Sequence, residues 1–342
     1  PGGGRLYQYV ILIYNQRVSY KCRMQPAPFA LDLSFAAFDA LNSAVAGPRL
    51  SYRELFSPHE DLPKPLRRWA AAHDIAPRAL TRRDRQLGGS SEKHLFGLRD
   101  GYAVESVLIR RRDGFTACIS SQVGCAFACQ FCASGQAGLK RNLSPGEIVE
   151  QVVRLGSKVN RIVFMGIGEP LNNYDNVLAA IRILRDRRGL DWPTTGITVS
   201  TIGIPKGLKA LREEHLGLNL TISLHATTDE TRSRLIPGAR KHDIADVVGG
   251  ALSWARRHNR VATFVYLLLP GINDSDADLR RLTGMFRNEP ARLNLMRWNE
   301  VDGLGFGRIS DLRLMQFRAG LERAGIPVVV RDTQGNRIDA AC

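Results

Sequence analysis

The sequence has no long hydrophobic run and is short of acidic residues. The longest apolar stretches, Tyr9–Tyr14 and Val261–Leu269, are far shorter than the roughly 18–20 residues that span a bilayer, so we expect a soluble protein. Only 33 Asp and Glu oppose 48 Lys and Arg, which gives a formal net charge of +15. The segment Lys64–Arg112 holds 12 basic and 5 acidic residues. This excess predicts a polyanionic partner, most simply nucleic acid, although a general bias toward arginine is the alternative.

Cysteine is also scarce, and half of the six cysteines fall in one short segment. Cys125, Cys129 and Cys132 have the spacing C-x3-C-x2-C directly after a predicted strand. Three thiolates from one loop can bind three irons of a [4Fe–4S] cluster and leave the fourth iron open. The alternative is zinc, which needs a fourth protein ligand, for which Cys118 is the nearest candidate. Either use of free thiols predicts the reducing cytosol.

The pattern along the chain predicts a β-hairpin followed by alternating strands and helices. The hairpin comprises Ala103–Arg110 and Phe115–Ser120, after a short basic helix over Leu62–His73 and a polar surface loop over residues 78–93. Later strands are predicted at Arg161–Met165, Ile197–Ser200, Leu218–Leu224, Val261–Leu268, Arg292–Met296 and Pro327–Arg331. Helices are predicted from Ser144 to about Leu155 and at Asn176–Arg187, Pro205–His215, Ile244–Arg257, Ser275–Arg287 and Ile309–Ala324. About six such units predict an α/β fold with a parallel sheet, either open or partly closed as a barrel, and ligands at the carboxyl ends of its strands.

Four segments resemble the RlmN/Cfr group of radical S-adenosylmethionine (SAM) RNA methyltransferases. They are SSQVGCAFACQFCASGQAGLKRNLSPGEIVEQV (Ser120–Val152), GIGEPLNNYDNV (Gly166–Val177), SLHATTDETRSRLIP (Ser223–Pro237) and RDTQGNRIDAAC (Arg331–Cys342). The resemblance runs from about His94 to the last residue. It implies a radical-SAM partial (β/α)6 barrel over residues 94–342, entered through the hairpin and ending in a catalytic cysteine tail. Residues 1–93 are then an N-terminal accessory region, basic and in contact with RNA, although the first 60 residues show no clear match to the helical domain expected there.

The resemblance also implies a role for each site residue. Cys125, Cys129 and Cys132 would hold the [4Fe–4S] cluster. Glu105 would accept the proton of the substrate ring, Cys342 would carry the methyl group, and Cys118 would resolve the intermediate through a transient disulfide with Cys342. The residues that would contact SAM are Gly168, Glu169, Ser200, Ser223, Leu224, His225 and Asn299.

The implied reaction is methylation of an adenine ring carbon through a methyl-cysteine intermediate, with two SAM molecules used per turnover. We expect C2 rather than C8, in ribosomal RNA and with tRNA as a further candidate, because members of the C2 branch tend to carry Ala after His225. Expected partners are RNA and an electron donor such as flavodoxin or ferredoxin, for a cytoplasmic monomer. Candidate phosphate contacts are Lys64–Arg112, Lys140, Arg141 and Arg182–Arg188. The alternatives are a C8 methyltransferase of the Cfr kind, which confers antibiotic resistance, a radical SAM enzyme with another substrate, and a zinc protein that binds RNA without catalysis.

Overall fold

One continuous sheet organises the described part of the chain. The computed structural model describes residues 27–44, 50–59, 61–156, 158–299 and 304–331. The ten strands of the sheet are, in their spatial order, β1 (Thr81–Gly88), β2 (Ser91–Gly97), β3 (Ala103–Arg111), β4 (Gly114–Cys118), β7 (Val159–Phe164), β8 (Ile197–Thr201), β9 (Asn219–Ser223), β10 (Ala262–Leu268), β11 (Ala291–Arg297) and β12 (Val328–Arg331). Strands β1 to β4 pair antiparallel, and every pairing from β4 onward is parallel. The predicted hairpin is therefore confirmed as β3 and β4.

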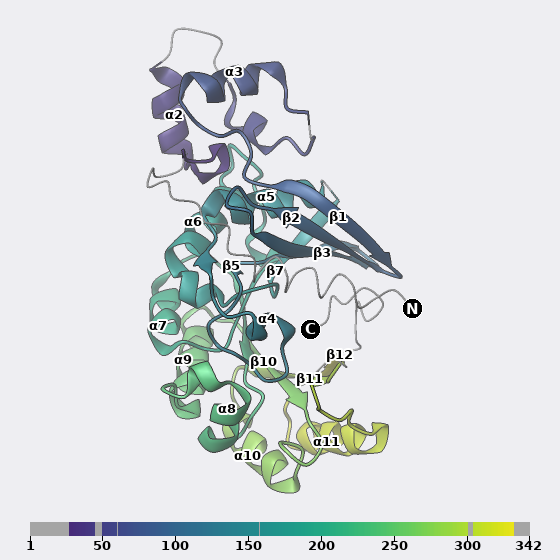
Figure 1. The fold of residues 1–342 in the computed structure, drawn as a ribbon. Helices are drawn as coiled ribbons and strands as arrows, with labels where there is room; N and C mark the ends of the chain where they lie inside the picture. Colours follow the sequence, from purple (N-terminus) through teal and green to yellow (C-terminus); the bar gives the residue numbers. More distant parts are fainter. Residues whose placement is uncertain (1–26, 45–49, 60, 157, 300–303, 332–342) are drawn as a thin grey trace.

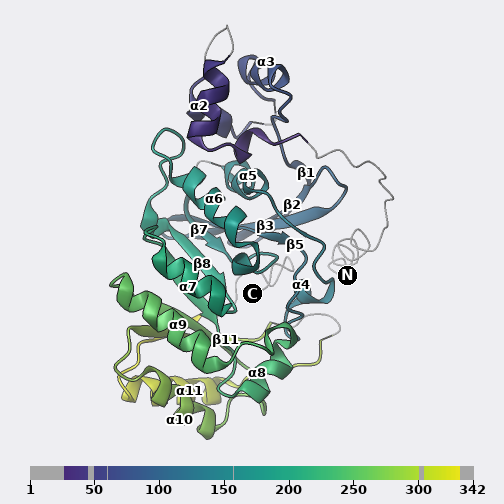
Figure 2. The same cartoon turned by 90° about the vertical axis from the view of Figure 1, so that its left-hand side faces the viewer.

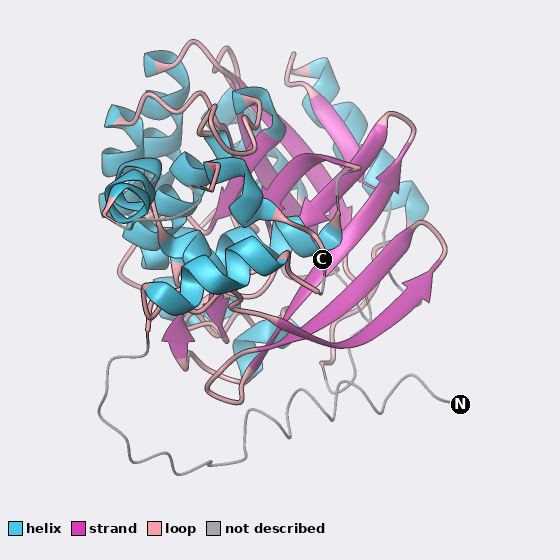
Figure 3. Ribbon diagram, turned by 90° about the horizontal axis from the view of Figure 1, so that it is seen from above, coloured by secondary structure: helices cyan, strands magenta, loops and turns pink. Residues whose placement is uncertain are grey.

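Helices connect the parallel strands and lie on one side of the sheet. They are α5 (Pro145–Leu155), α6 (Tyr174–Arg185), α7 (Pro205–Glu213), α8 (Asp229–Leu235), α9 (Ile244–Arg257), α10 (Asp276–Phe286) and α11 (Asp311–Arg323). Figure 2 shows α6, α7 and α9 side by side in front of the strands, and Figure 3 shows the strands as one curved surface. Because β1 and β12 are the two edges, the sheet stays open. The predicted α/β fold, a partial barrel of β/α units, is confirmed. No described helix has the length and hydropathy needed to cross a membrane.

Local sequence signals explain why these helices begin where they do. Ser144 caps α5: its hydroxyl accepts the N–H of Glu147 at 3.2 Å, and the Glu147 carboxylate accepts the N–H of Ser144 at 2.9 Å. Pro145 takes the first helical position, where its missing N–H costs nothing. Ser275 and Asp278 form the same reciprocal cap on α10. These caps fix where each crossover helix leaves the carboxyl edge of the sheet, which is the edge that carries the predicted site.

A small helical unit lies at the amino-terminal end of the sheet (Figure 1). It consists of the 3-10 turns η1 (Ala30–Asp32) and η2 (Tyr52–Phe56) and the helices α2 (Phe35–Ser43) and α3 (Lys64–Ala72). Its core is aromatic: the ring of Phe38 lies 5.3 Å from that of Tyr52 and 5.2 Å from that of Trp69. Asp32 joins this unit to α5 by accepting the N–H of Gly146 at 2.6 Å. A helical unit is thus present where the sequence gave no clear match to one.

The prediction of a surface loop over residues 78–93 is wrong. Strand β1 runs through it and pairs with β2 from Thr81 opposite Gly97 to Gly88 opposite Ser91. The error has a physical cause: β1 is an edge strand whose residues are exposed or half-buried, so it lacks the apolar alternation that reveals a half-buried strand. The expected boundary between residues 93 and 94 falls inside β2. The division into an accessory region and a core at that point stays a prediction.

Candidate active site

The predicted site residues gather at the carboxyl edge of the parallel sheet. Glu169 lies in the turn after β7, Ser200 near the end of β8, Ser223 at the end of β9, and Asn299 just after β11. Parallel strands bring their carboxyl ends to one edge, so the topology collects residues that are far apart in sequence. The loop that carries the three clustered cysteines reaches the same region from β4.

The cysteine loop has a narrow neck. Strand β5 (Gln122–Val123) pairs with β6 (Arg141–Asn142), and the N–H of Lys140 donates to the carbonyl of Val123 at 2.9 Å. At the neck, Gly124 has φ +75°, and a Cβ there would lie 1.9 Å from the carbonyl oxygen of Gly138. Only glycine fits both constraints. The loop therefore leaves and re-enters the fold at one fixed point.

The thiols lie against a small apolar cluster that is separate from the main core. Cys125 and Cys129 pack on this cluster, whose buried members are Phe127, Ile202, Leu235, Ile236, Ala239, Leu267, Leu269 and Trp298. Burial, with a smaller contribution from the neighbouring Glu169 and Cys132, raises the pKa of the Cys125 thiol to about 12. Burial likewise raises the pKa of Cys129 well above its ordinary value, and the buried cation Arg232 opposes that rise. The two thiols are therefore protonated in the absence of a metal group, and a bound cluster would stabilise their thiolate form.

The donor set fits a cluster better than a single ion. Among the described residues, no three His, Cys, Asp or Glu side chains surround one point closely enough to hold one metal ion. Zinc requires four ligands at about 2.0–2.3 Å from a single centre, whereas the cysteine loop supplies three thiols. In a cubane cluster each thiolate binds a different iron. The three sulfur atoms therefore surround the cluster and do not converge on a single metal ion.

The turn that contains Gly168 and Glu169 is built onto the segment that leads to the cysteines. Gly166 donates its N–H to the carbonyl of Ile119 at 3.0 Å, and Glu169 donates its N–H to Oε1 of Gln122 at 2.9 Å. Gly168 has φ +107°, and a Cβ there would lie 2.6 Å from Cβ of Gln122. The two motifs that the sequence singled out separately therefore form one rigid unit.

The Glu169 carboxylate is buried and accepts three hydrogen bonds. Its donors are the Thr201 hydroxyl at 2.5 Å, the N–H of Ile202 at 2.9 Å and the N–H of Leu171 at 2.9 Å. Burial raises its pKa to about 7, while these donors and the charge of Arg232 act in the opposite direction. Such a carboxylate suits a cationic ligand such as the amino group of SAM. Sequence reasoning missed Thr201, whose position in a strand carries no sign of this contact.

His225 is held in one tautomer by the backbone. It has a left-handed conformation with φ +56°, and its Nδ1 accepts the N–H of Leu267 at 3.0 Å. Asn273 secures the same turn by donating to the carbonyls of both His225 and Leu267 at 2.7 Å. The imidazole packs edge-on against Phe131 of the cysteine loop, with ring centroids 4.8 Å apart. His225 thus connects the β9 turn to the cysteine loop, and Asn273 is a second residue that the sequence did not reveal.

Glu105 and Cys118 lie on the same face of the sheet. Cys118 pairs directly with Val107 across β3 and β4, and Glu105 stands two residues from Val107 on β3. Side chains of paired residues, and of residues two apart on a strand, point to the same side. The opposite face packs on α5, where Ser106 donates to Gln151 at 2.8 Å. Cys342, the third predicted catalytic residue, lies outside the described residues.

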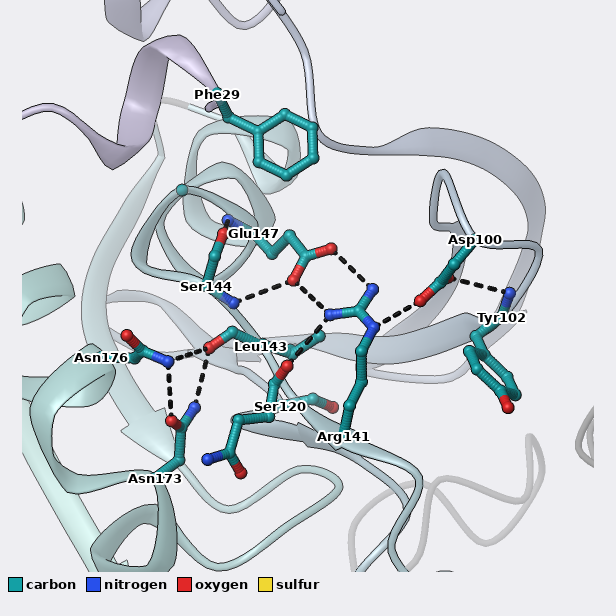
Figure 4. A network of polar contacts seen from close by, with 12 residues as sticks. Phe29, Asp100, Tyr102, Ser120, Arg141, Leu143, Ser144, Glu147, Asn173 and Asn176 are labelled. Carbon is teal, nitrogen blue, oxygen red and sulfur yellow. Dashed lines mark hydrogen bonds and ion pairs between the residues drawn. The ribbon is translucent and has the colours of Figure 1, made fainter. Parts of the chain in front are cut away.

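A polar network around Arg141 holds the neck of the cysteine loop in place (Figure 4). Arg141 donates to both oxygens of the buried Glu147 at 2.8 Å and forms an ion pair with Asp100. Asn173 donates to the carbonyls of Ser121 and Leu143 at 2.8 and 2.9 Å. The guanidinium of Arg141 is therefore already engaged with carboxylates, so its expected role as a phosphate contact is not favoured by this geometry.

The same holds for most of the second expected phosphate site. Arg182 donates to both carboxylate oxygens of Glu214 at 3.0 and 2.9 Å. Arg185 donates to the carbonyl of Leu216 at 2.9 Å, and Arg188 forms a paired contact with Asp186 at 2.8 and 2.7 Å. These arginines stabilise the fold locally. RNA contacts are better sought among arginines that do not already have an anionic partner.

Comparison with known proteins agrees with this geometry. The model of the radical SAM superfamily matches residues 119–283. A probable RNA methyltransferase from Rhodopseudomonas palustris (strain BisB5) is 69% identical over 313 residues, which cover 92% of this chain and 87% of that protein. A probable dual-specificity RNA methyltransferase RlmN from Moorella thermoacetica (strain ATCC 39073 / JCM 9320) is 39% identical over 295 residues, which cover 82% of this chain and 83% of that protein.

A solved structure extends the likeness to nearly the whole chain. The crystal structure of a radical SAM methyltransferase from Sphaerobacter thermophilus superimposes with a TM-score of 0.86 at 35% identity, and the match covers 93% of this chain and 98% of that one. The cofactors of this enzyme class are a [4Fe–4S] cluster and SAM, which the three cysteines and the carboxyl-edge residues fit. The chain belongs to the RlmN-type family of radical SAM RNA methyltransferases.

Proposed function

We propose that this enzyme methylates C2 of an adenine in ribosomal RNA, with tRNA as a second substrate. The observation that carries the proposal is the placement of Glu105 and Cys118 on one face of the sheet that also presents the cofactor site at its edge. An acceptor for a ring proton and a thiol that can resolve an intermediate are what ring-carbon methylation needs. The relative from Moorella thermoacetica is named a dual-specificity RNA methyltransferase, which supports two RNA substrates.

We assign each residue one task in this reaction. When bound, the cluster and SAM supply the radical chemistry that activates a methyl group carried by Cys342. Cys125, Cys129 and Cys132 hold the cluster. Gly168, Glu169, Ser200, Ser223, Leu224, His225 and Asn299 bind and orient SAM.

The remaining bond-making and bond-breaking steps use this chain's own acid–base and thiol groups. The one electron that is in excess after radical addition and loss of the ring proton would return to the bound cluster, and the two electrons that later reduce the disulfide would come from the proposed electron donor. Glu105 takes the proton that leaves the adenine ring carbon. The Cys118 thiolate then attacks the sulfur of Cys342, so that an S–S bond forms and the bond from sulfur to the transferred carbon breaks. The electron pair of that bond stays with the carbon, which picks up a proton to become the methyl group.

We propose that the exposed arginines of the β1–β3 region contact the RNA backbone. Arg111 and Arg112 lie at the turn between β3 and β4, next to the turn between β1 and β2, because Arg110 donates its N–H to the carbonyl of Ser90 at 2.7 Å. Neither Arg111 nor Arg112 forms an ion pair with a described residue. Other exposed arginines of these strands are Arg82, Arg83 and Arg110, whereas Arg85 is already paired with Glu92. Positive charge on one flank of the substrate face is suited to a phosphate backbone.

We further propose a cytosolic monomer that receives electrons from a flavodoxin or a ferredoxin. Analytical ultracentrifugation tests the monomeric state. An assay of SAM cleavage with each donor tests the source of the electrons. A sedimentation coefficient that corresponds to a dimer, or cleavage that neither donor supports, would contradict them.

Nucleoside mass spectrometry of RNA from cells with and without the enzyme tests the proposed reaction. We expect 2-methyladenosine in ribosomal RNA, and in tRNA, only when the enzyme is present. If 8-methyladenosine appears instead, the C8 alternative replaces the C2 assignment. If neither nucleoside appears while purified enzyme still cleaves SAM, RNA is not its substrate.

A further inference from the structure

A buried lysine stands beside the proposed proton acceptor. Nζ of Lys93 lies 3.4 Å from Oε1 of Glu105, and the lysine side chain is only 4% exposed, against 22% for the glutamate. Building on the function proposed above, we infer that Lys93 is a positioning residue for Glu105: it keeps the carboxylate ionised and oriented toward the substrate ring.

The register of the sheet places the two side chains together. Leu95 pairs with Glu105 and Lys93 pairs with Val107, so Lys93 and Glu105 are diagonal neighbours on β2 and β3. Diagonal neighbours in an antiparallel pair are within reach of long side chains. Cys118 pairs with Val107 on the next strand, so Lys93, Glu105 and Cys118 share one face. The lysine therefore lies on the substrate side of the sheet.

The other charged groups of β2 belong to the opposite face. Glu92 lies 3.5 Å from His94 and forms a 2.6 Å ion pair with Arg85 on β1. Glu92 and His94 are the sequence neighbours of Lys93 on β2. Because successive side chains of a strand point to opposite faces, both lie on the face that packs on α5. The titratable groups that the neighbouring strands place on the face of Lys93 are Glu105 and Arg111 on β3, Cys118 on β4, and Asp84 on β1, which pairs with Leu95.

Burial of a lysine needs a reason, because a buried charge is costly without a partner. An ordinary core position in β2 would be served by an apolar residue of similar volume. Unlike a methionine of similar volume, Lys93 places a positive charge beside Glu105, and this charge favours the ionised carboxylate. This matters most when an adenine ring covers the site, because water then no longer solvates the carboxylate.

The backbone of Glu105 is fixed as well. The Ser120 hydroxyl donates to the carbonyl of Glu105 at 2.6 Å and accepts the N–H of Ile167 at 3.0 Å. Ser120 thus ties the acceptor strand to the turn that precedes Gly168 and Glu169. Ser120 fixes the main chain at Glu105, and the ion pair with Lys93 limits the torsions of its side chain.

The proton transfer itself is simple to balance. The C–H bond of the ring carbon breaks, its electron pair stays on the ring, and the proton ends on Glu105. Lys93 keeps its own proton throughout. The pair changes from an ammonium and a carboxylate to an ammonium and a neutral carboxylic acid.

The test compares Lys93→Met, which removes the charge and keeps the volume, with Lys93→Arg, which keeps the charge. Lys209→Met on the exposed face of α7 is the matched control. For each variant we would measure iron per chain, release of 5′-deoxyadenosine, methyladenosine formed in RNA, and the pH–rate profile. We expect Lys93→Met to keep iron and 5′-deoxyadenosine release, to lose at least about tenfold in methyladenosine, and to have its acidic limb moved to higher pH. Lys93→Arg should restore most of the rate.

The background of Glu105→Gln separates a role through Glu105 from a general effect on the fold. If Lys93 acts through the carboxylate, adding Lys93→Met to E105Q should cause no further loss. An equal loss in both backgrounds, or full methylation by Lys93→Met alone, would overturn the inference. Should Lys93→Met lose iron or unfold, the Lys93→Arg pH profile decides: a profile identical to that of wild type supports the role of charge, and a loss of iron in this variant too overturns it. Wild-type enzyme that forms no methyladenosine would overturn the proposed function, and with it this inference.

Discussion

The imidazole of His225 accepts the backbone N–H of Leu267 at Nδ1, at a distance of 3.0 Å. Burial, followed by the charge of Arg232, lowers the pKa of this histidine to about 3. The ring is therefore neutral at physiological pH, with its proton on Nε2. Its orientation is set by main-chain atoms before any cofactor binds.

This neutral histidine should make the free energy of unfolding depend on pH. An unfolded histidine titrates near 6.5, so between about pH 6.5 and pH 3 the unfolded state binds one more proton than the folded state. Acid therefore weakens the fold in this window. His225→Asn keeps an acceptor for Leu267 and tolerates a left-handed backbone, so it should lose less stability between pH 7 and pH 5 than the wild type. Urea unfolding of the apoprotein at both pH values measures the difference, and the exposed His59→Asn is the control, with no such effect.

Gly124 should be essential for cluster binding and not for the fold. Gly124→Ala would force a Cβ to 1.9 Å from the carbonyl oxygen of Gly138 and displace the neck of the cysteine loop. We expect the iron content to fall to the level of Cys129→Ala, while circular dichroism stays native. Gly89→Ala is the control, because Gly89 also has positive φ, +58°, but open space around it. That control should lose about 1–2 kcal/mol of stability and no iron; normal iron in Gly124→Ala would contradict the predicted neck.

Variants of the two predicted catalytic thiols, Cys118 and Cys342, should fail at different steps. Cys342→Ala should retain iron and SAM cleavage but form no methylated RNA, because the methyl group has no carrier. Cys118→Ala should also retain iron, yet accumulate enzyme covalently joined to RNA. A denaturing gel before and after ribonuclease treatment distinguishes the two. Methylated RNA from Cys342→Ala would show that the methyl group reaches the ring by another route.

Arg111 and Arg112 should contribute to RNA binding through phosphate contacts. Replacing both by Ala should weaken binding and reduce the slope of log K against log salt by about 1.4, at about 0.7 per contact for single-stranded nucleic acid. Arg182→Ala is the matched control, because that exposed arginine is already bound by Glu214. Fluorescence anisotropy with a labelled RNA across a salt series gives both slopes. Equal slopes for the double variant and the wild type would place the RNA elsewhere.

The sequence predicts the barrel well because its strands and helices have strong periodic signals. The helix Ile244–Arg257 has the predicted bounds, and the other predicted strands and helices of the barrel match to within a few residues. Strand β1 could not be predicted in this way, since a strand exposed along its length has no apolar face. Periodicity reports burial on one side, and it fails where both sides face solvent.

The cysteine loop and the Glu169 turn were also accessible from the sequence, because each is a compact motif. Thr201, Asn273 and Lys93 were not, and the reason is common to all three. Each acts through a partner on another strand or turn: Thr201 lies 32 residues from Glu169, and Asn273 lies 48 residues from His225. A threonine in a strand or an asparagine in a turn looks ordinary until the fold brings its partner to it.

The bond between Asp32 and Gly146 limits where the chain can be shortened. Asp32 lies in the N-terminal helical unit, yet its carboxylate accepts an N–H from the first turn of α5, the helix that follows the cysteine loop. A fragment that begins at residue 94 would start inside β2, lose the whole of β1 and leave that N–H without its acceptor. It would also remove Lys93. A catalytic fragment that keeps these contacts therefore has to include Phe29, whose isolated bridge with Ala76 holds the start of the helical unit.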